Sequence, residues 1–385
     1  MQQSSILRQM LLSAGLLLLA SMTSVLGSQT IDDRGEYHGK GRDTKGAVRL
    51  LRAGDWTTEG SSGEYVTICR DNVKFIQDSI TIWCDEARHW ERKQLLMLQG
   101  RVVIMEPTRR LDADMVTYDA GVRKTIAQGN FKVTRDSVIL TSRQGRYEER
   151  GDVATVQKSI VLDDLRRKIR LTGDYGVWYL KEEKGMVPAD PILTKLDTIG
   201  ALETRIIADT MEYNVTKGYA EAISQVVLTW DDVKGWCDKL YYYPDNRKAL
   251  LIGHPRVLRE RDEALGDSIW IYFTEQQIDS LEVFGKALLY TPSDSSKDSP
   301  RSVMEGFRIA LDFEKKQVVR IQSDRQAIGI YHIFENGIDK GSNRVSGDQI
   351  ILFVKDGQLD NIKVEGGTQG TYYPPELAKE IRSDE

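Results

Sequence analysis

The amino-acid sequence predicts an all-β fold, an elongated stacked β-solenoid or β-jellyroll (β-taco) of about nine repeats. Three observations predict it. One short motif recurs along most of the chain. Within each copy, β-branched and aromatic residues alternate with polar residues at period two, as in strands with one buried face. Turn-forming residues separate the alternating segments.

One residue, which we call the anchor, marks each copy of the motif. The anchors are Asp85, Asp114, Arg143, Asp174, Asp209, Asp238, Asp267, Arg308 and Asp348. They follow one another at steps of 29, 29, 31, 35, 29, 29, 41 and 40 residues, so insertions have accumulated late in the chain. Each copy is one supersecondary unit, which can bury its apolar face only by stacking on its neighbours.

Two other kinds of residue recur at fixed distances from the anchor. The residue before the anchor is small: Cys84, Ala113, Ser142, Gly173, Ala208, Cys237, Gly266 and Gly347. An aromatic residue follows four or five positions after it: Trp90, Tyr118, Tyr147, Trp178, Tyr213, Tyr242 and Tyr272. Turn residues come next, as in 119–121 and 214–218, so each copy is two strand segments joined by a turn.

The anchor column allows a structural and a functional interpretation. An Asp beside a turn bonds local backbone groups, and this is the interpretation that we expect to hold. A row of carboxylates that binds cations or performs catalysis is the alternative. Arg143 interrupts the row, which argues against a metal site.

Residues 1–27 have the features of a secretory signal peptide. Arg8 supplies a positive charge, Met10–Ala20 is an apolar segment too short to span a bilayer easily, and small residues precede a cleavage site near Gly27. We therefore expect export across the inner membrane to the periplasm. The alternative is an uncleaved anchor helix.

The remaining chain divides by pattern. We expect a lead-in segment at 28–63, a β-stack of seven repeats at 64–291, and a linker or loop at 292–302, where Ser, Asp and Pro dominate. Two further β-repeats follow at 303–373, and a polar tail at 374–385.

Composition excludes several function classes. The formal net charge of −5 is dispersed along the chain, which argues against nucleic-acid binding. The four His have no zinc-ligand spacing, and neither a nucleophile elbow nor a phosphate- or dinucleotide-binding loop is present. We therefore expect no enzyme activity, no catalytic residues, no metal and no cofactor.

The three Cys lie at positions 69, 84 and 237. Cys84 and Cys237 occupy the small-residue column, which predicts small buried apolar side chains. A Cys69–Cys84 disulfide is the alternative, because this spacing could place the two on adjacent strands.

The best copies of the motif carry a family resemblance. Residues 111–118 read Leu-Asp-Ala-Asp-Met-Val-Thr-Tyr, residues 127–133 read Ala-Gln-Gly-Asn-Phe-Lys-Val, and residues 207–213 read Ile-Ala-Asp-Thr-Met-Glu-Tyr. This series resembles the OstA/LptA-like family (organic solvent tolerance protein N-terminal-like domain) of lipopolysaccharide transport. The resemblance extends from about Tyr65 to Tyr373.

Three features depart from the family pattern. They are Arg143 in the anchor column, Pro188 and Pro191 in the fourth repeat, and the insertion at 292–302.

The resemblance implies a non-enzymatic periplasmic component of lipopolysaccharide transport to the outer membrane. Its stack would hold acyl chains in an apolar groove and dock end to end with similar β-stacks by pairing edge strands. The partners would be lipopolysaccharide or a related lipid and other β-stack transport proteins. The lipid-groove candidates are Val102, Ile104, Phe131, Val133, Ile160, Leu162, Val226 and Leu228, which alternate with polar residues on the strands after each turn.

Two other function classes remain open on the sequence. An exported parallel β-solenoid carbohydrate enzyme, a lyase or hydrolase, would have shorter coils and a patch of acids and bases gathered from successive coils. A purely structural envelope protein would have a stack without a ligand.

Overall fold

The computed structural model describes residues 49–377 apart from 62–63, 78, 91, 120, 149–152, 180–181, 275–276, 294–299, 336–337 and 356–357. The expected signal peptide at 1–27 and most of the expected linker at 292–302 lie outside the described residues. Within the described part, no helix is long and apolar enough to cross a bilayer. The described chain is almost entirely β-strand, which confirms the predicted fold class.

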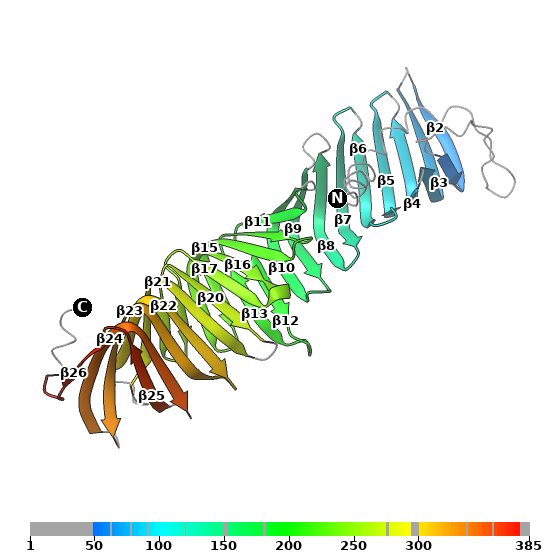
Figure 1. Ribbon diagram of the computed structural model, residues 1–385. Coiled ribbons are helices and arrows are strands. Elements are labelled where there is room, and N and C mark those ends of the chain that lie inside the picture. The colour runs from blue at the N-terminus through cyan, green and yellow to red at the C-terminus, as the bar shows by residue number, and fades with distance from the viewer. Residues whose placement is uncertain are drawn as a thin grey trace, which may run out of the picture. The chain divides into compact units, whose positions relative to one another are not determined.

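The chain forms two compact units, one ending at Ala189 and one starting at Asp190. The strands of the first unit are β1 (Arg49–Arg52), β2 (Asp55–Ser61), β3 (Glu64–Gln77), β4 (Ile80–Trp90), β5 (Leu95–Met105), β6 (Arg110–Asp119), β7 (Lys124–Arg135), β8 (Val138–Glu148), β9 (Val153–Asp164), β10 (Ile169–Tyr179) and β11 (Lys184–Pro188). Figure 1 shows β3 to β9 side by side in chain order.

The strands of the second unit are β12 (Ile192–Leu196), β13 (Leu202–Ile207), β14 (Thr210–Asn214), β15 (Tyr219–Trp230), β16 (Val233–Tyr243), β17 (Lys248–Ile252), β18 (Arg256–Arg259), β19 (Asp262–Leu265), β20 (Ser268–Phe273), β21 (Ile278–Pro292), β22 (Arg301–Glu314), β23 (Gln317–Glu335), β24 (Ile338–Lys355), β25 (Gln358–Glu365) and β26 (Gln369–Tyr373). A single 3-10 turn, Pro244–Asn246, joins β16 to β17.

Strands pair antiparallel with their neighbours in both units. In the first unit, β4 pairs with β3 and β5, and β7 pairs with β6 and β8. In the second unit, β22 pairs with β21 and β23. Hairpins of this kind are local along the chain, whereas a parallel β-helix needs parallel pairing between coils. The observed pairing is therefore contrary to the parallel-solenoid alternative.

Long strands are interrupted near their middle by a shift of register. Two consecutive residues with positive φ, which we call a corner pair, lie at this shift in β3, β5, β7, β9, β15, β21 and β23, and between the short strands β11 and β12, β17 and β18, and β25 and β26. The corner pairs are Asp71–Asn72, Gly100–Arg101, Gly129–Asn130, Lys158–Ser159, Ala189–Asp190, Ser224–Gln225, Gly253–His254, Gly285–Lys286, Arg325–Gln326 and Gly366–Gly367. Extra residues in one strand bend it and re-aim the side chains that follow.

The bend divides each strand into two limbs whose inner faces pack on each other. In β4 the buried positions are 80, 82 and 84 before the bend, and 87 and 89 after it. In the first unit the inner side chains form one buried cluster that includes Val73, Leu98, Val116 and Tyr118. Stacking of the bent strands thus buries an apolar face that no single hairpin could bury.

The sheet register corrects the position of one predicted anchor, and backbone hydrogen bonds add a further anchor position at Gly54. In β22 the shifted residues are Gly306 and Phe307, so the anchor of this repeat is Phe307 and not Arg308. Before β3, the N–H of Gly54 donates to the carbonyls of Arg70 and Asp71, which gives the first corner its own partner. β1 and β2 lie within the segment expected as a lead-in, so ordered strands begin before residue 64.

Candidate functional site

The eight lipid-groove candidates lie directly after corner pairs on β5, β7, β9 and β15. We call them the interior columns. Seven are buried, with exposed fractions of 1% at Val102, 5% at Ile104, 7% at Phe131, 2% at Ile160, 4% at Leu162, 1% at Val226 and 0% at Leu228. Val133 is partly buried and packs against the same core. Their polar neighbours Lys132 and Gln225 are exposed, as the period-two alternation requires.

Side chains cross from one limb to the other close to the bend. A Cβ on Gly145 would lie 2.7 Å from the ring of Phe131, and a Cβ on Gly176 would lie 3.1 Å from Cδ1 of Ile160. In the second unit, a Cβ on Gly235 would lie 2.9 Å from Cδ2 of Leu251. At these three bends, glycine on one limb makes room for a large side chain from the other, and protein atoms fill the interior beside the bend.

Some buried polar atoms have no hydrogen-bond partner among the described residues. Examples are Thr125 Oγ1, Trp230 Nε1 and Tyr331 Oη. Each of these residues lies on the buried inner face of its strand. A buried polar group without a partner costs roughly 1–3 kcal/mol. The inner faces thus carry hydrogen-bonding capacity beside their apolar surface.

The anchor carboxylates bind the corner that faces them. Asn130 Nδ2 donates to Asp114 Oδ1 at 3.1 Å, and Nδ1 of His254 lies 3.2 Å from Asp238 Oδ2. The anchor N–H groups also bind the bend, as in Asp238 N–H to the carbonyl of Gly253 at 3.0 Å. The structural interpretation of the anchor column is confirmed, because Asp114 and Asp238 form local hydrogen bonds with the corner that faces them.

The described residues contain no group of three or more His, Cys, Asp or Glu that could hold a metal ion. All three Cys are free and buried, so Cys69 and Cys84 form no disulfide. Burial raises the pKa of Cys69 to about 11 and that of Cys84 to about 12. Both thiols are therefore protonated at neutral pH, as expected for small apolar side chains in a core.

The recurring aromatic residues take two kinds of position. Tyr118, Tyr213 and Tyr242 are buried. Burial raises the pKa of Tyr242, which lies 3.4 Å from the hydroxyl of Thr204. By contrast, Tyr272 is half-buried on the outer face, where its ring stacks on Trp270 with centroids 6.1 Å apart.

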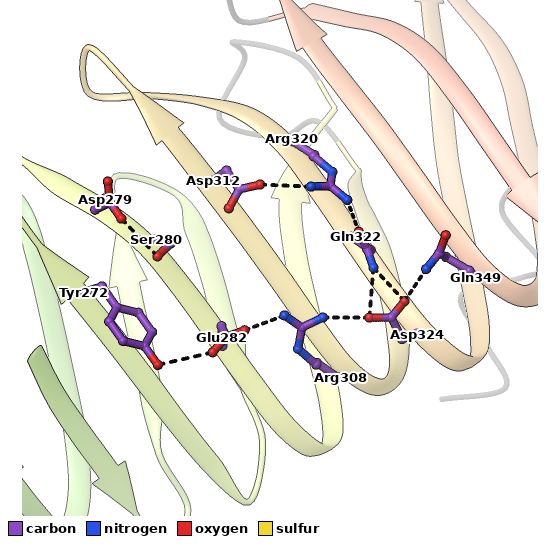
Figure 2. A network of polar contacts seen from close by, with 10 residues as sticks. All are labelled: Tyr272, Asp279, Ser280, Glu282, Arg308, Asp312, Arg320, Gln322, Asp324 and Gln349. Carbon is purple, nitrogen blue, oxygen red and sulfur yellow. Dashed lines mark hydrogen bonds and ion pairs between the residues drawn. The ribbon is translucent and has the colours of Figure 1, made fainter.

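A polar network covers part of the outer face of the second unit (Figure 2). Arg308 lies between two acids: Nη2 donates to Glu282, and Nη1 donates to Asp324 Oδ2 at 2.8 Å. Gln322 and Gln349 donate to Asp324 Oδ1 at 2.8 Å and 2.6 Å. Burial opposes ionisation of Asp324, but these hydrogen bonds outweigh it and lower its pKa. This outer face is polar and stabilises the sheet across β21 to β24.

Sequence reasoning did not find this network. Its two acids, Glu282 and Asp324, lie 26 and 16 residues from Arg308, and the three meet only because the register of three strands aligns them. Charged residues at strand positions that face outward were the only available signal.

No curated protein matches the chain. A solved structure that matches is LptH, described as the LptA homologous periplasmic component of the conserved lipopolysaccharide transport device from Pseudomonas aeruginosa. It is 14% identical, and the match covers 37% of this chain and 95% of that chain with a TM-score of 0.30, a value too low to carry an argument.

The family model described as LptA/(LptD N-terminal domain) LPS transport protein matches residues 85–277, half of the chain. The matched region contains seven anchors, from Asp85 to Asp267, with the corner pairs that face them up to Gly253–His254. The chain therefore belongs to the LptA/LptD N-terminal domain family of lipopolysaccharide transport proteins, and it is not an enzyme.

Proposed function

We propose that this chain is a periplasmic component of lipopolysaccharide transport to the outer membrane, in which the interior columns hold acyl chains of the lipid. Family membership supports the general role. The observation that supports the finer proposal is the burial of the interior columns between two limbs whose inner faces pack on each other.

The energetics favour an acyl ligand between the limbs. In this proposal the limbs, which the chain connects through the corner pairs, separate by a change of backbone conformation at the bend. A lipid chain that entered would then replace contacts between apolar side chains with contacts to methylenes. Each buried methylene contributes about 0.8 kcal/mol, so a long chain would offset the loss of packing between the limbs.

The buried polar atoms support a ligand that is not purely hydrocarbon. Thr125, Trp230 and Tyr331 each carry a polar atom that lacks a partner among the described residues. Ester, amide and hydroxyl groups beside the acyl chains of a glycolipid could accept or donate hydrogen bonds there. A simple fatty acid would satisfy fewer of them.

Open edges on the two units support docking to similar β-stacks. In the described chain, β2 pairs only with β3, and β26 pairs only with β24. Most residues of β2 and β26 are exposed. An unpaired strand edge presents free N–H and C=O groups that a strand of a partner can complete.

Copurification tests the lipid-binding role. The chain isolated from cells grown with radiolabelled lipopolysaccharide precursors should retain labelled lipopolysaccharide in near-stoichiometric amounts. A chain that carries no labelled lipid, or a purified chain that degrades polyuronides, would contradict the role.

Photo-crosslinking tests the docking role. A crosslinker at Thr58 in β2 or Thr371 in β26 should trap another β-stack transport protein in intact cells. Lys132 in β7 is the matched control, because it is exposed on a strand that is paired on both sides. Equal trapping from Lys132 would show that the edges have no special role.

A further inference from the structure

One corner of the first unit carries an open cavity of about 520 Å³ on its surface. Its lining residues are Arg143, Gln157, Lys158, Ser159, Asp174 and Tyr175. All of them except Asp174 and Tyr175 come from β8 and β9, and those two come from β10. We call this place the Arg143 corner.

The charges at the Arg143 corner reverse those at the corners beside it. At the two preceding corners the anchor is an acid, Asp85 or Asp114, and the first residue of the corner pair is Gly100 or Gly129. Here the anchor is Arg143 and the first residue of the corner pair is Lys158. Two cations therefore stand where the neighbouring corners have a carboxylate and a glycine.

Neither cation forms an ion pair with Asp174, the one acid in the lining of the cavity. Among the described residues, Arg143 and Lys158 form no hydrogen bond or ion pair, and both are exposed. By contrast, Arg101, two corners earlier in the chain, has Nη2 2.6 Å from Oδ1 of Asp85. Two like charges on one small cavity repel each other, and Asp174 is the one acid in the lining that offsets them.

The backbone conformation of Lys158 adds a free-energy cost at the Arg143 corner. Lys158 has φ of 67°, in the left-handed region that a residue with a Cβ disfavours. Glycine occupies the equivalent position at five other corners without this cost. A charged residue held in a strained backbone conformation beside a cavity is typical of a ligand-binding site.

The cavity already holds one anionic group of the protein. The N–H of Ser159 donates to Oδ1 of Asp174 at 3.4 Å, which is a long bond. With Arg143 and Lys158 each contributing one positive charge and Asp174 one negative charge, the lining retains a net positive charge. An incoming oxyanion with short bonds would compete with the Asp174 carboxylate for this amide.

We propose that the Arg143 corner is a binding subsite for a phosphate group, carried either on a lipid headgroup or free in solution. The Arg143 guanidinium supplies two parallel N–H donors that match two phosphate oxygens. Lys158 supplies a compact charge, and the side chains of Gln157 and Tyr175 supply neutral donors at the rim. The subsite lies outside the interior columns, so it exists whether or not those columns hold lipid.

Two substitutions that restore the pattern of the neighbouring corners test the subsite. Arg143→Asp and Lys158→Gly recreate the acid and the glycine found at Asp85 and Gly100, so both variants should fold. Lys158→Gly should raise the thermal midpoint because it removes the left-handed lysine. Arg101→Gln is the matched control, since it removes an exposed cation from a corner of the same unit, two corners earlier in the chain.

Titration calorimetry with inorganic phosphate should show saturable binding to the wild-type chain. Each of the two substitutions should weaken it roughly tenfold or more, and Arg101→Gln should leave it unchanged. Asp174→Asn should tighten it, because this change removes the competing carboxylate. Flotation with phosphatidylcholine vesicles that contain phosphatidic acid distinguishes the source: vesicle binding lost in Arg143→Asp indicates a headgroup, and binding of free phosphate alone indicates a soluble ligand.

The proposal is overturned if the wild-type chain binds neither probe, or if Arg143→Asp and Lys158→Gly bind as well as Arg101→Gln. Neither probe contains lipopolysaccharide, so failure here leaves the lipid-transport role untouched. Conversely, loss of lipopolysaccharide copurification would leave the phosphate result standing.

Discussion

Arg101 and Asp85 face each other across the bend between β4 and β5, with Nη2 of Arg101 2.6 Å from Oδ1 of Asp85. The hydrogen bond from Arg101 lowers the pKa of Asp85. Both side chains are largely exposed, and exposed ion pairs contribute little to stability. The bend must therefore be held mainly by the backbone, by glycine at close approaches, and by packing of the inner faces.

At the last corner pair, Gly366–Gly367, the effect of a close contact on stability can be distinguished from the effect of a positive φ. Gly366 and Gly367 both have positive φ, 72° and 58°. A Cβ on Gly366 would lie 2.6 Å from Cγ of Asp348, whereas a Cβ on Gly367 would meet nothing within 4 Å. We expect Gly367→Ala to lower the free energy of unfolding by about 1 kcal/mol through φ alone, and Gly366→Ala to lower it by about 2–3 kcal/mol.

Urea unfolding of both variants and the wild type measures these losses. Asp348→Ala combined with Gly366→Ala should recover part of the loss, since it removes the carboxylate that the new Cβ meets. Equal losses for the two single variants would show that contact with Asp348 plays no part in holding the bend.

The repeat itself could be predicted from sequence because its chemistry recurs. Small residues, anchors and alternating apolar positions keep their spacing, so the strands and their buried faces followed from the pattern. Phe131 and Val226 are buried and their neighbours Lys132 and Gln225 exposed, as the alternation requires.

The corner pairs could not be predicted in the same way. Lys158, Ser224 and Arg325 all have positive φ, yet their side chains share no property that marks a turn. This backbone state is imposed by the paired strands on either side, which form only after stacking. The anchor at Phe307 was missed for a related reason, because an aromatic residue took the position held elsewhere by Asp.

Figure 2 shows a second feature that sequence could not reveal, the position of Arg308 between Glu282 and Asp324. All three side chains are at least two-thirds buried. We expect Arg308→Gln to lower the free energy of unfolding by about 1–2 kcal/mol at neutral pH, because two acids lose a charged donor.

The pKa of Asp324 gives this variant a pH signature. Its folded-state pKa lies below the ordinary 3.8, so it contributes stability above that value, which is lost as pH falls through the folded pKa. The variant should therefore lose less stability than the wild type on acidification. Lys363→Gln, in the exposed pair with Glu365, should change stability by less than about 0.5 kcal/mol; a loss as large as that of Arg308→Gln would contradict the account.

The pKa of Asp262 predicts a pH dependence of stability opposite to that of Asp324. Burial at the start of β19 raises its pKa from the ordinary 3.8 to about 6, and the nearby Arg259 offsets this only in part. Because the folded state holds the proton more tightly, stability is highest below 3.8 and falls as pH rises to about 6.

Asp262→Asn should thus raise the free energy of unfolding at neutral pH, by on the order of 1–3 kcal/mol, and have no effect in strong acid. Urea midpoints across this pH range measure the difference. Asp279→Asn, at an exposed position in β21, is the matched control. A similar response of the two variants would count against a buried carboxyl at Asp262.

The central claim is that lipid chains enter between the limbs and contact the interior columns. Photo-crosslinkers at Phe131 and Val226 in intact cells test it most directly, with Lys132 and Gln225 as adjacent outward controls. The account predicts lipopolysaccharide adducts from Phe131 and Val226 and none from the controls. Adducts only from Lys132 and Gln225, or from none of the four, would contradict it.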